Sequence, residues 1–324
     1  MKEFKVAVVG ATGLVGGTMI GALESMGFPV GQLIPLASPR SAGKTVSFRG
    51  QPYLVRAVSR EAFEGVDLAL FAAGGAASLQ WAPVAASLGA LVVDNSSAFR
   101  MEEDVPLVVP EVNPGDLRPF GIIANPNCST IQCVVALNPL KRFGLRRVIY
   151  SSYQAVSGSG QKGLDDLRNG TQNFYPHPIN GNVLPHIDSF LEDGYTKEEH
   201  KMVNETRKIL HLPGLPVTAT TVRVPVPFGH GVSINAQLER PFHMQEIRES
   251  LAAQEGLIIQ DEPGENLYPM PLYAAGRDEV FVGRIRRDFS VENGLNLWVV
   301  ADNVRKGAAV NAVQIALRIL GAGK

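Results

Sequence analysis

Near its start the chain reads Val6-Ala7-Val8-Val9-Gly10-Ala11-Thr12-Gly13-Leu14-Val15-Gly16, an apolar run that leads into a glycine-rich turn. Such a run is typical of a parallel strand that is covered on both faces of its sheet. Glycines after the strand permit a tight turn into a helix, which we expect over residues 14–26. The stretch therefore predicts the first strand, turn and helix of a doubly wound α/β domain.

Strands and helices continue to alternate up to Pro126. Further strand-like runs lie at residues 33–37, 68–72, 91–94 and 121–124, and a helical stretch of small residues lies at 76–88. This alternation indicates a Rossmann-type domain with a parallel sheet.

After Pro126 long segments rich in Val, Ile and Thr suggest a mostly antiparallel sheet with one face on helices, an α+β domain. We expect strands at 146–155, 217–226, 232–239, 279–287 and 295–301, and helices at 129–143, 158–169 and 196–210. Apolar residues at helical spacing predict a terminal helix over 303–320 that returns to the first domain. The predicted domains are residues 1–127 with 303–324, and residues 128–302.

The composition excludes several classes of protein. Of 324 residues 45% are hydrophobic and 19% charged, and the net charge of −1 indicates no surface for nucleic acid or anionic membranes. No apolar run approaches the ~20 residues that cross a bilayer, and residues 1–5 lead into a strand rather than a signal sequence. Cys128 and Cys133 lie five apart on one expected helix and point to different sides of it. We therefore expect a cytoplasmic protein without disulfides.

The glycine turn is a candidate dinucleotide site. A helix N-terminus favours a pyrophosphate, although Gly-x-x-Gly-x-x-Gly departs from the usual spacing and the alternative is a turn that only packs the helix. The second strand ends in Ala37-Ser38-Pro39-Arg40-Ser41, without the acid that holds the ribose of NAD. Arg40 with Ser38 and Ser41 suits a 2′-phosphate, so we predict NADP, unless Arg40 is a solvated surface residue.

A candidate nucleophile lies in Asn125-Pro126-Asn127-Cys128-Ser129-Thr130, directly before a helical run. Asn127 can cap that helix, so Cys128 would lie in the first turn, where N–H groups and the macrodipole stabilise a thiolate. The same N–H groups, with the Asn127 amide, could hold a developing oxyanion. Cys133, among apolar neighbours, is expected to be a core residue.

A thiolate that attacks a carbonyl needs a proton shuttle. Of six histidines, His230 stands in the glycine-flanked turn Pro227-Phe228-Gly229-His230-Gly231 between two β-rich segments, whereas the other five have the settings of surface residues. His230 is therefore the candidate acid/base.

Six motifs together resemble those of the aspartate-semialdehyde dehydrogenases, which belong to a wider group with a glyceraldehyde-3-phosphate-dehydrogenase-like fold. They stand in the same order along the whole chain: Gly10–Gly13, Asp94–Arg100, Asn125–Thr130, Tyr153–Gly158, Arg223–Val226 with His230, and Asp302–Ala309. The resemblance implies NADPH-dependent reduction of β-aspartyl phosphate to aspartate semialdehyde through a Cys128 acyl-thioester, in the biosynthesis of lysine, threonine, methionine and isoleucine.

The resemblance also implies residue roles. His230 would be the acid/base, and Gln154 would orient the substrate carbonyl. Other side chains would bind the substrate: Arg100 and Lys201 its phosphate, Arg223 its α-carboxylate, Glu198 its α-ammonium, with Asn127 nearby. The cofactor would contact Gly10, Thr12, Gly13, Leu14, Val15, Ser38, Arg40 and Ser41, and its nicotinamide end Ser157, Gly158 and Asn303. We expect no metal, and we expect the chain to form a homodimer or a dimer of dimers.

Alternatives remain open at this stage. An N-acetylglutamyl-phosphate reductase would need no acid such as Glu198, and a non-catalytic NADP-binding redox sensor would need no intact nucleophile and base. Glu198 and Lys201 could be an exposed ion pair, Arg223 and His230 could decorate a sheet edge, Gln154 could be an ordinary strand amide, and Arg100 a surface charge. The family's Gly-His-Ser is Gly229-His230-Gly231 here, and the role of the 169–192 loop is undecided.

Overall fold

The computed structural model describes residues 2–321, which form two compact units. One unit ends at Pro126 and includes the C-terminal stretch from Ala308, and the other runs from Asn127 to Gly307. Asn127 and residues 303–307 therefore fall in the second unit, whereas the sequence prediction placed them in the first. Their contacts explain this, because Asn127 caps a helix of the second unit and Asn303 bonds to Ser157.

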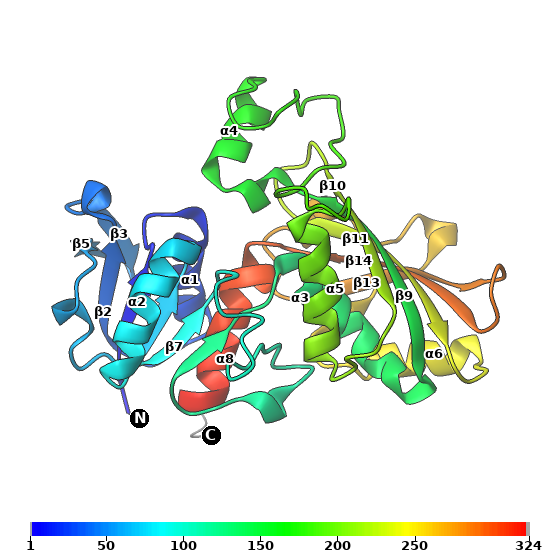
Figure 1. Cartoon of the computed structure of the whole chain (residues 1–324), viewed down its shortest axis with the longest axis horizontal. Helices are drawn as coiled ribbons and strands as arrows, with labels where there is room; N and C mark the ends of the chain where they lie inside the picture. Colours follow the sequence, from blue (N-terminus) through cyan, green and yellow to red (C-terminus); the bar gives the residue numbers. More distant parts are fainter. Residues whose placement is uncertain (1, 322–324) are drawn as a thin grey trace. The chain divides into compact units, whose positions relative to one another are not determined.

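A parallel six-stranded sheet forms the centre of the first unit, in the order β5-β2-β1-β6-β7-β8. Its strands are β1 (Phe4–Val9), β2 (Val30–Ala37), β5 (Arg56–Ala57), β6 (Leu68–Phe71), β7 (Leu91–Asp94) and β8 (Ile122–Ala124). Helices α1 (Leu14–Ser25) and α8 (Val310–Leu320) contribute to one buried cluster, and α2 (Gly75–Ser87) to a second (Figure 1). The predicted doubly wound architecture is confirmed.

The sequence analysis missed the hairpin β3 (Thr45–Phe48) and β4 (Gln51–Leu54), whose residues are mostly exposed. It also predicted one continuous terminal helix, whereas the structure has a π-helical turn at Arg305–Ala309 before α8. Short 3-10 turns lie at Pro39–Ser41, Glu61–Phe63, Pro114–Asp116, Asn138–Phe143, Val156–Ser159 and Pro263–Glu265.

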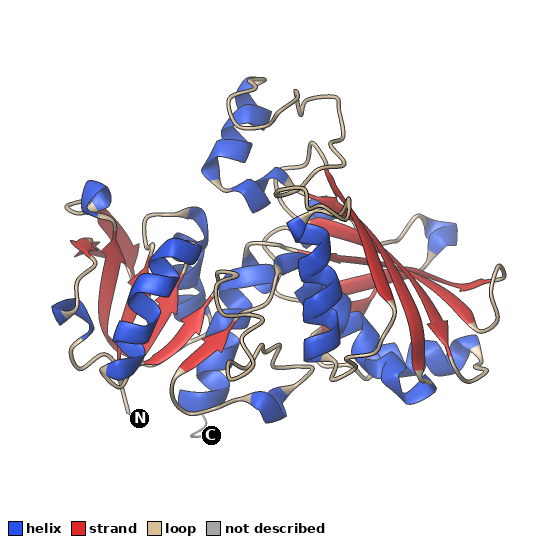
Figure 2. Cartoon of the chain, viewed as in Figure 1, coloured by secondary structure: helices blue, strands red, loops and turns tan. Residues whose placement is uncertain are grey.

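A mixed six-stranded sheet forms the centre of the second unit, in the order β10-β9-β11-β14-β13-β12 (Figure 2). Its strands are β9 (Leu145–Gln154), β10 (Val217–Arg223), β11 (His230–Leu238), β12 (Leu257–Ile259), β13 (Val280–Asp288) and β14 (Gly294–Ala301). The three central pairs are antiparallel, and the two outer pairs, β10 with β9 and β12 with β13, are parallel.

Helices cover one face of this sheet. α3 (Cys128–Leu137) and α5 (Lys197–Ile209) pack there, and α4 (Gln161–Asn169), α6 (Met244–Ala252) and α7 (Pro271–Ala274) complete the unit. Along β9 the residues Val148, Tyr150 and Ser152 are fully buried, while Ile149 and Tyr153 on the opposite face are partly exposed. The opposite face is therefore incompletely covered within one chain.

Residues 170–196, which join α4 to α5, form a segment that we call the excursion. The Asp166 carboxylate accepts hydrogen bonds from Thr171 Oγ1 (2.7 Å) and from the amides of Asn173 and Phe174, which fixes the start of the excursion. Further along, Leu184 and Arg223 exchange both backbone hydrogen bonds, at 2.9 and 2.8 Å. Within residues 2–321 no helix is long and apolar enough to cross a membrane.

Candidate active site

The glycine turn of the first unit is shaped by close backbone contacts. Gly10 has φ +87°, and a Cβ there would lie 2.8 Å from the carbonyl carbon of Ala72. A Cβ on Gly16 would lie 2.1 Å from Gly10 O, so the first turn of α1 can approach the loop only with glycine at both positions. The turn leaves the N-terminus of α1, from Gly13 onward, open in the manner that suits a dinucleotide phosphate.

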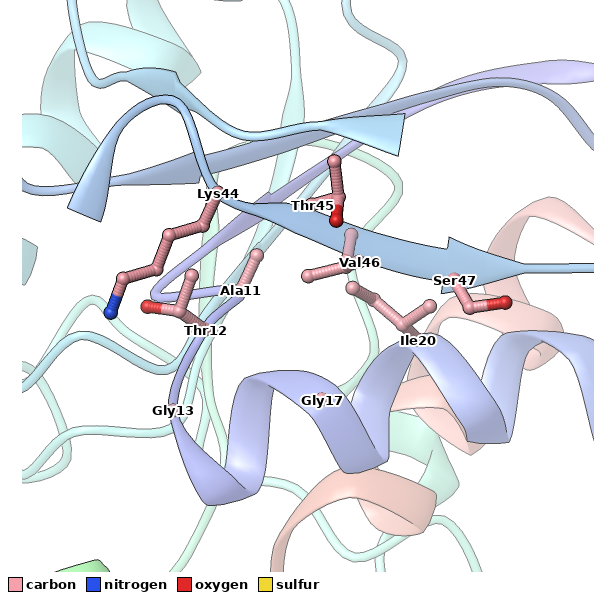
Figure 3. A pocket seen from close by; sticks show the side chains of 9 residues that line it. All are labelled: Ala11, Thr12, Gly13, Gly17, Ile20, Lys44, Thr45, Val46 and Ser47. Atoms are coloured by element: carbon pink, nitrogen blue, oxygen red, sulfur yellow. The ribbon is translucent and has the colours of Figure 1, made fainter. Parts of the chain in front are cut away.

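A pocket of about 430 Å³ adjoins this turn, lined by Ala11, Thr12, Gly13, Gly17, Ile20, Lys44, Thr45, Val46 and Ser47 (Figure 3). Lys44 extends along the pocket toward Thr12 in the figure, and the sequence analysis did not single it out. Ser38, Arg40 and Ser41 lie in and next to the 3-10 turn after β2, with Ser38 and Arg40 exposed. Leu14 and Val15 begin α1.

Arg100 also belongs to the first unit, and the structure rules out its interpretation as a surface charge. The side chain is buried, Nε donates to Asn125 O (2.9 Å) and Nη2 donates to Asn95 O (2.9 Å). Backbone carbonyls therefore hold the guanidinium in one orientation.

Cys128 is the first residue of α3, as predicted, and is half-buried. Asn127 Oδ1 accepts hydrogen bonds from the amides of Ser129 (2.9 Å) and Thr130 (3.2 Å). These two N–H groups are committed to the helix cap, which corrects the expectation that they would hold an oxyanion. The macrodipole at Cys128 is unaffected by the cap and favours the thiolate.

The two cysteines differ as expected. Cys133 is fully buried, and burial, with a smaller contribution from Cys128, raises the pKa of its thiol well above the ordinary value. Cys128, in contrast, lies against the π-helical turn, since a Cβ on Gly307 would be 2.8 Å from Cys128 Cβ.

His230 is fully buried at the first position of β11, and the turn that was predicted for it is made by Gly229 at φ +85°. Its Nδ1 accepts a hydrogen bond from the Ala155 amide (2.9 Å), and its Nε2 has no partner. Burial, and then the charge of Arg223, lower the pKa of His230 well below its ordinary value, against a backbone hydrogen bond with Gly229 that raises it. The imidazole is therefore neutral near pH 7. The other five histidines are exposed or half-buried.

Arg223 is the last residue of β10. Its side chain and that of His230 both lie against Ala155 and Gly158. Its Nη1 donates to Ala155 O (2.7 Å), while its Nε is buried without a partner. A Cβ on Gly158 would lie 2.8 Å from Arg223 Nη1 and 3.6 Å from His230 Cε1. Only glycine at position 158 therefore lets the side chains of Arg223 and His230 lie side by side.

Glu198 joins several predicted substrate-binding residues. Its Oε1 accepts from Asn127 Nδ2 (2.9 Å) and Gln154 Nε2 (3.2 Å), and its Oε2 is 3.3 Å from Lys201 Nζ. Glu198 is only 5% exposed, so the interpretation as an exposed ion pair is wrong, and Gln154, which is 1% exposed, donates to Glu198 and to Ser152 Oγ.

Glu205 is a site residue that was not predicted from the sequence, and its Oε2 accepts the Asn127 amide at 2.6 Å. Glu205 is 1% exposed and stands seven positions after Glu198 on α5. Two turns of helix place both carboxylates on one face, and that spacing could have identified Glu205 as a second anchor for Asn127.

The residues expected at the nicotinamide end also lie together. Asn303 Nδ2 donates to Ser157 Oγ (2.9 Å), and Asn303 Oδ1 accepts from the Gly229 amide (2.9 Å). Asn303 therefore fixes the backbone on which His230 stands.

Trp298 explains why a glycine follows His230. A Cβ on Gly231 would lie 2.4 Å from Cζ2 and Cη2 of Trp298, whose ring reaches across to Tyr153 at a centroid distance of 5.6 Å. The serine expected from the family fits at position 231 only if the Trp298 ring moves. Among the residues described, no group of three His, Cys, Asp or Glu side chains is arranged to hold a metal ion.

Comparison with known proteins agrees with this geometry. Residues 5–119 match the model of the semialdehyde dehydrogenase NAD binding domain, and residues 137–306 match that of the semialdehyde dehydrogenase dimerisation domain. The chain is 55% identical to the aspartate-semialdehyde dehydrogenase of Aquifex aeolicus over 97% of each chain.

Two solved structures extend the comparison. That of aspartate semialdehyde dehydrogenase II from Vibrio cholerae complexed with ASA is 44% identical, covers 100% of each chain and gives a TM-score of 0.94. That of aspartate semialdehyde dehydrogenase with NADP from Candida albicans is 27% identical, covers 99% of each chain and gives a TM-score of 0.79.

Proposed function

We propose a role for each residue of the site from one premise, that the chain belongs to the aspartate-semialdehyde dehydrogenase family. The reaction is the reductive dephosphorylation of β-aspartyl phosphate to aspartate semialdehyde, and its reverse. One observation carries the assignment of the site: Arg223 Nε and His230 Nε2 are buried without partners on the two strands that flank β9. An unsatisfied buried polar group costs about 1–3 kcal/mol, so two of them together indicate a place built for a polar ligand.

Cys128 is the proposed nucleophile. Its sulfur forms a bond to the acyl carbon, the carbon–oxygen bond to phosphate breaks, and phosphate leaves with the bonding electrons. The nicotinamide cofactor, when bound, supplies the hydride that reduces the resulting thioester. The sulfur–carbon bond of the thiohemiacetal then breaks, and Cys128 leaves as a thiolate at the N-terminus of α3.

His230 is the proposed acid/base, and the backbone hydrogen bond at its Nδ1 suits that role. An amide can only donate, so the bond from Ala155 requires a lone pair on Nδ1 and leaves the ring proton on Nε2. The backbone of Gly229 favours the protonated ring, because it raises the pKa of His230 against burial. Nε2, which has no partner, can donate or accept a proton toward the substrate.

The substrate-binding roles follow the charges of the pocket. Arg223, anchored through Nη1, offers its unpartnered Nε edge to the α-carboxylate. Glu198 accepts the α-ammonium, and Gln154, held against Glu198, orients the carbonyl. Lys201 and Arg100 bind phosphate, and Asn127 fixes both the α3 cap and Glu198.

The cofactor is a nicotinamide dinucleotide, and we propose that it is NADP. The glycine turn fits the pyrophosphate because Cβ atoms at Gly10 and Gly16 would close the loop. Ser38, Arg40 and Ser41 supply a cation and two hydroxyls for the 2′-phosphate, and no acidic residue ends β2. A relative of known structure was solved with NADP. The cytoplasmic location remains a prediction from the sequence.

The test is phosphate-dependent reduction of NADP with aspartate semialdehyde, set against N-acetylglutamate semialdehyde. We expect turnover with the first substrate only, no turnover in Cys128→Ser, and retained cofactor binding in that variant. Cys133→Ser is the matched control and should remain active, because Cys133 is a buried helix residue. Unchanged turnover in Cys128→Ser, or a preference for the N-acetylated substrate, would refute the proposal.

A further inference from the structure

Lys201 is shared between two carboxylates, and the proposed mechanism accounts for only one of them. Its Nζ lies 3.3 Å from Glu198 Oε2 and 2.7 Å from Asp188 Oδ2. Glu198 belongs to the substrate pocket, whereas Asp188 comes from the excursion, thirteen positions before Lys201. The shorter contact of the phosphate-binding lysine is therefore made to a residue without an assigned role.

The backbone holds the Asp188 carboxylate in place. Asp188 has φ +68°, which is uncommon outside glycine, and its Oδ1 accepts the amide of Ser189 at 2.8 Å. Ser189 O in turn accepts the amide of Lys197 (2.9 Å), which attaches this part of the excursion to the start of α5. These two hydrogen bonds, one from the amide of Ser189 and one from the amide of Lys197, thus fix Asp188 relative to Lys201.

The charges around Lys201 work against an anion. Burial raises the pKa of Asp188, but the hydrogen bond and charge of Lys201, with the Ser189 amide and the charge of Lys197, together outweigh burial and hold that pKa below its ordinary value. Asp188 is therefore ionised at any pH near neutrality. Two carboxylates, of Glu198 and Asp188, flank the Lys201 ammonium, and inorganic phosphate, itself an anion, must approach the same ammonium.

We propose that Asp188 competes with phosphate for Lys201 and so sets a low affinity for phosphate. When phosphate leaves, Asp188 retains the ammonium, which favours release of this product in the reductive direction and requires more phosphate in the oxidative direction. The inference rests on the proposed role of Lys201 in binding phosphate.

The test is the KM for inorganic phosphate in semialdehyde oxidation by the full-length enzyme. Asp188→Asn removes the charge but keeps an oxygen for the Ser189 amide. We expect its KM for phosphate to fall by about three- to fivefold, with the KM for the semialdehyde changed by less than about twofold, as for a partly screened surface charge. Phosphate should also inhibit the reductive reaction more strongly. A loss of structural order alone would not lower a KM.

The matched control is Asp193→Asn, because Asp193 is a carboxylate of the same excursion that is paired with His200 at 2.7 Å. Its KM for phosphate should stay at the wild-type value, and an equal fall there would overturn the inference in favour of a general charge effect. If Asp188→Asn folds poorly, Asp188→Gly removes the same charge and suits the positive φ.

Lys201→Met separates the inference from its premise. A raised KM for phosphate in Lys201→Met, with an unchanged or raised value in Asp188→Asn, overturns the role of Asp188 alone. An unchanged KM for phosphate in Lys201→Met overturns the role of Lys201 itself.

Discussion

Arg40 is the residue that we expect to decide between NADP and NAD. It follows β2 at the position where NAD-binding domains carry an acid. Arg40→Ala should lower kcat/KM with NADP by about 10- to 100-fold, the loss of hydrogen bonds to a charged group, and leave kcat/KM with NAD unchanged. Steady-state kinetics with both cofactors measure this, with the exposed Arg60→Ala as control. Equal losses with NADP and NAD would reject the assignment.

The low pKa of His230 predicts how the free energy of unfolding and kcat/KM depend on pH. Its folded-state pKa lies well below the ordinary value, so the unfolded chain binds a proton first as the pH falls. The free energy of unfolding should therefore decrease below about pH 6.5, where a free histidine titrates, and the acid limb of kcat/KM should lie below that pH as well. Urea titrations across this range measure the first effect, and His230→Gln should reduce it. An acid limb at or above pH 6.5 would show that the imidazole is not held neutral.

At the scale of single residues, the sequence predicted the groups whose chemistry is local. Cys128 follows from its place at a helix start, and His230 from its glycine-flanked turn. Asp188 could not be found in this way, because its partner Lys201 stands 13 positions away and only folding brings the two together. Glu205 could be found only through its helical spacing from Glu198, since its partner Asn127 stands 78 positions away.

Among the elements, β11 carries a substitution whose cost the structure predicts. Gly231→Ser would place Cβ 2.4 Å from the Trp298 ring, so the ring must move. We expect a loss of about 1–3 kcal/mol in the free energy of unfolding, the range for overpacking in a filled interior. Denaturant titration measures it.

A second substitution tests the cause of that loss. Trp298→Leu in the Gly231→Ser background should recover part of the stability, because the smaller side chain leaves room for Cβ. If the double variant is no more stable than Gly231→Ser, the clash with Trp298 is not the cause.

Elements with strong periodicity were predicted well, and those whose form depends on packing were not. The ranges for β1, α2 and β14 agree with the structure to within two residues. The π-helical turn at Arg305–Ala309 was missed, since its sequence is that of an ordinary helix and its form accompanies the contact of Gly307 with Cys128. The β3–β4 hairpin was missed because its residues are mostly exposed and each of its strands is only four residues long.

For the whole molecule, the open face of the second sheet predicts how two copies associate. Residues 137–306 match a dimerisation domain, and Ile149 and Tyr153 lie on the face opposite α3 and α5, which α7 covers only in part, beside Trp298. Tyr153→Arg should weaken the dimer, because an unpaired charge would be buried in the interface. Light scattering coupled to gel filtration measures the mass. Phe289→Arg is the control, since Phe289 is 91% exposed in the turn after β13. If the Tyr153→Arg variant stays dimeric at low concentration, the interface lies elsewhere.

The second boundary between the two units, near Asn303, could not be located from the sequence. The change in strand pattern after Pro126 predicted two domains, yet Asn303 falls with the second unit because it bonds to Ser157 and Gly229. These contacts span more than seventy positions, and nothing in the local sequence indicates them.

The exchange of backbone hydrogen bonds between Leu184 and Arg223 has a consequence for divergence within the family. Because main-chain atoms make this link, the side chain at position 184 takes no part in it and is constrained only by the burial that Leu184 has. Apolar substitutions at this position can therefore accumulate without loss of the bridge, whereas an insertion or deletion beside it would put the excursion out of register with the end of β10.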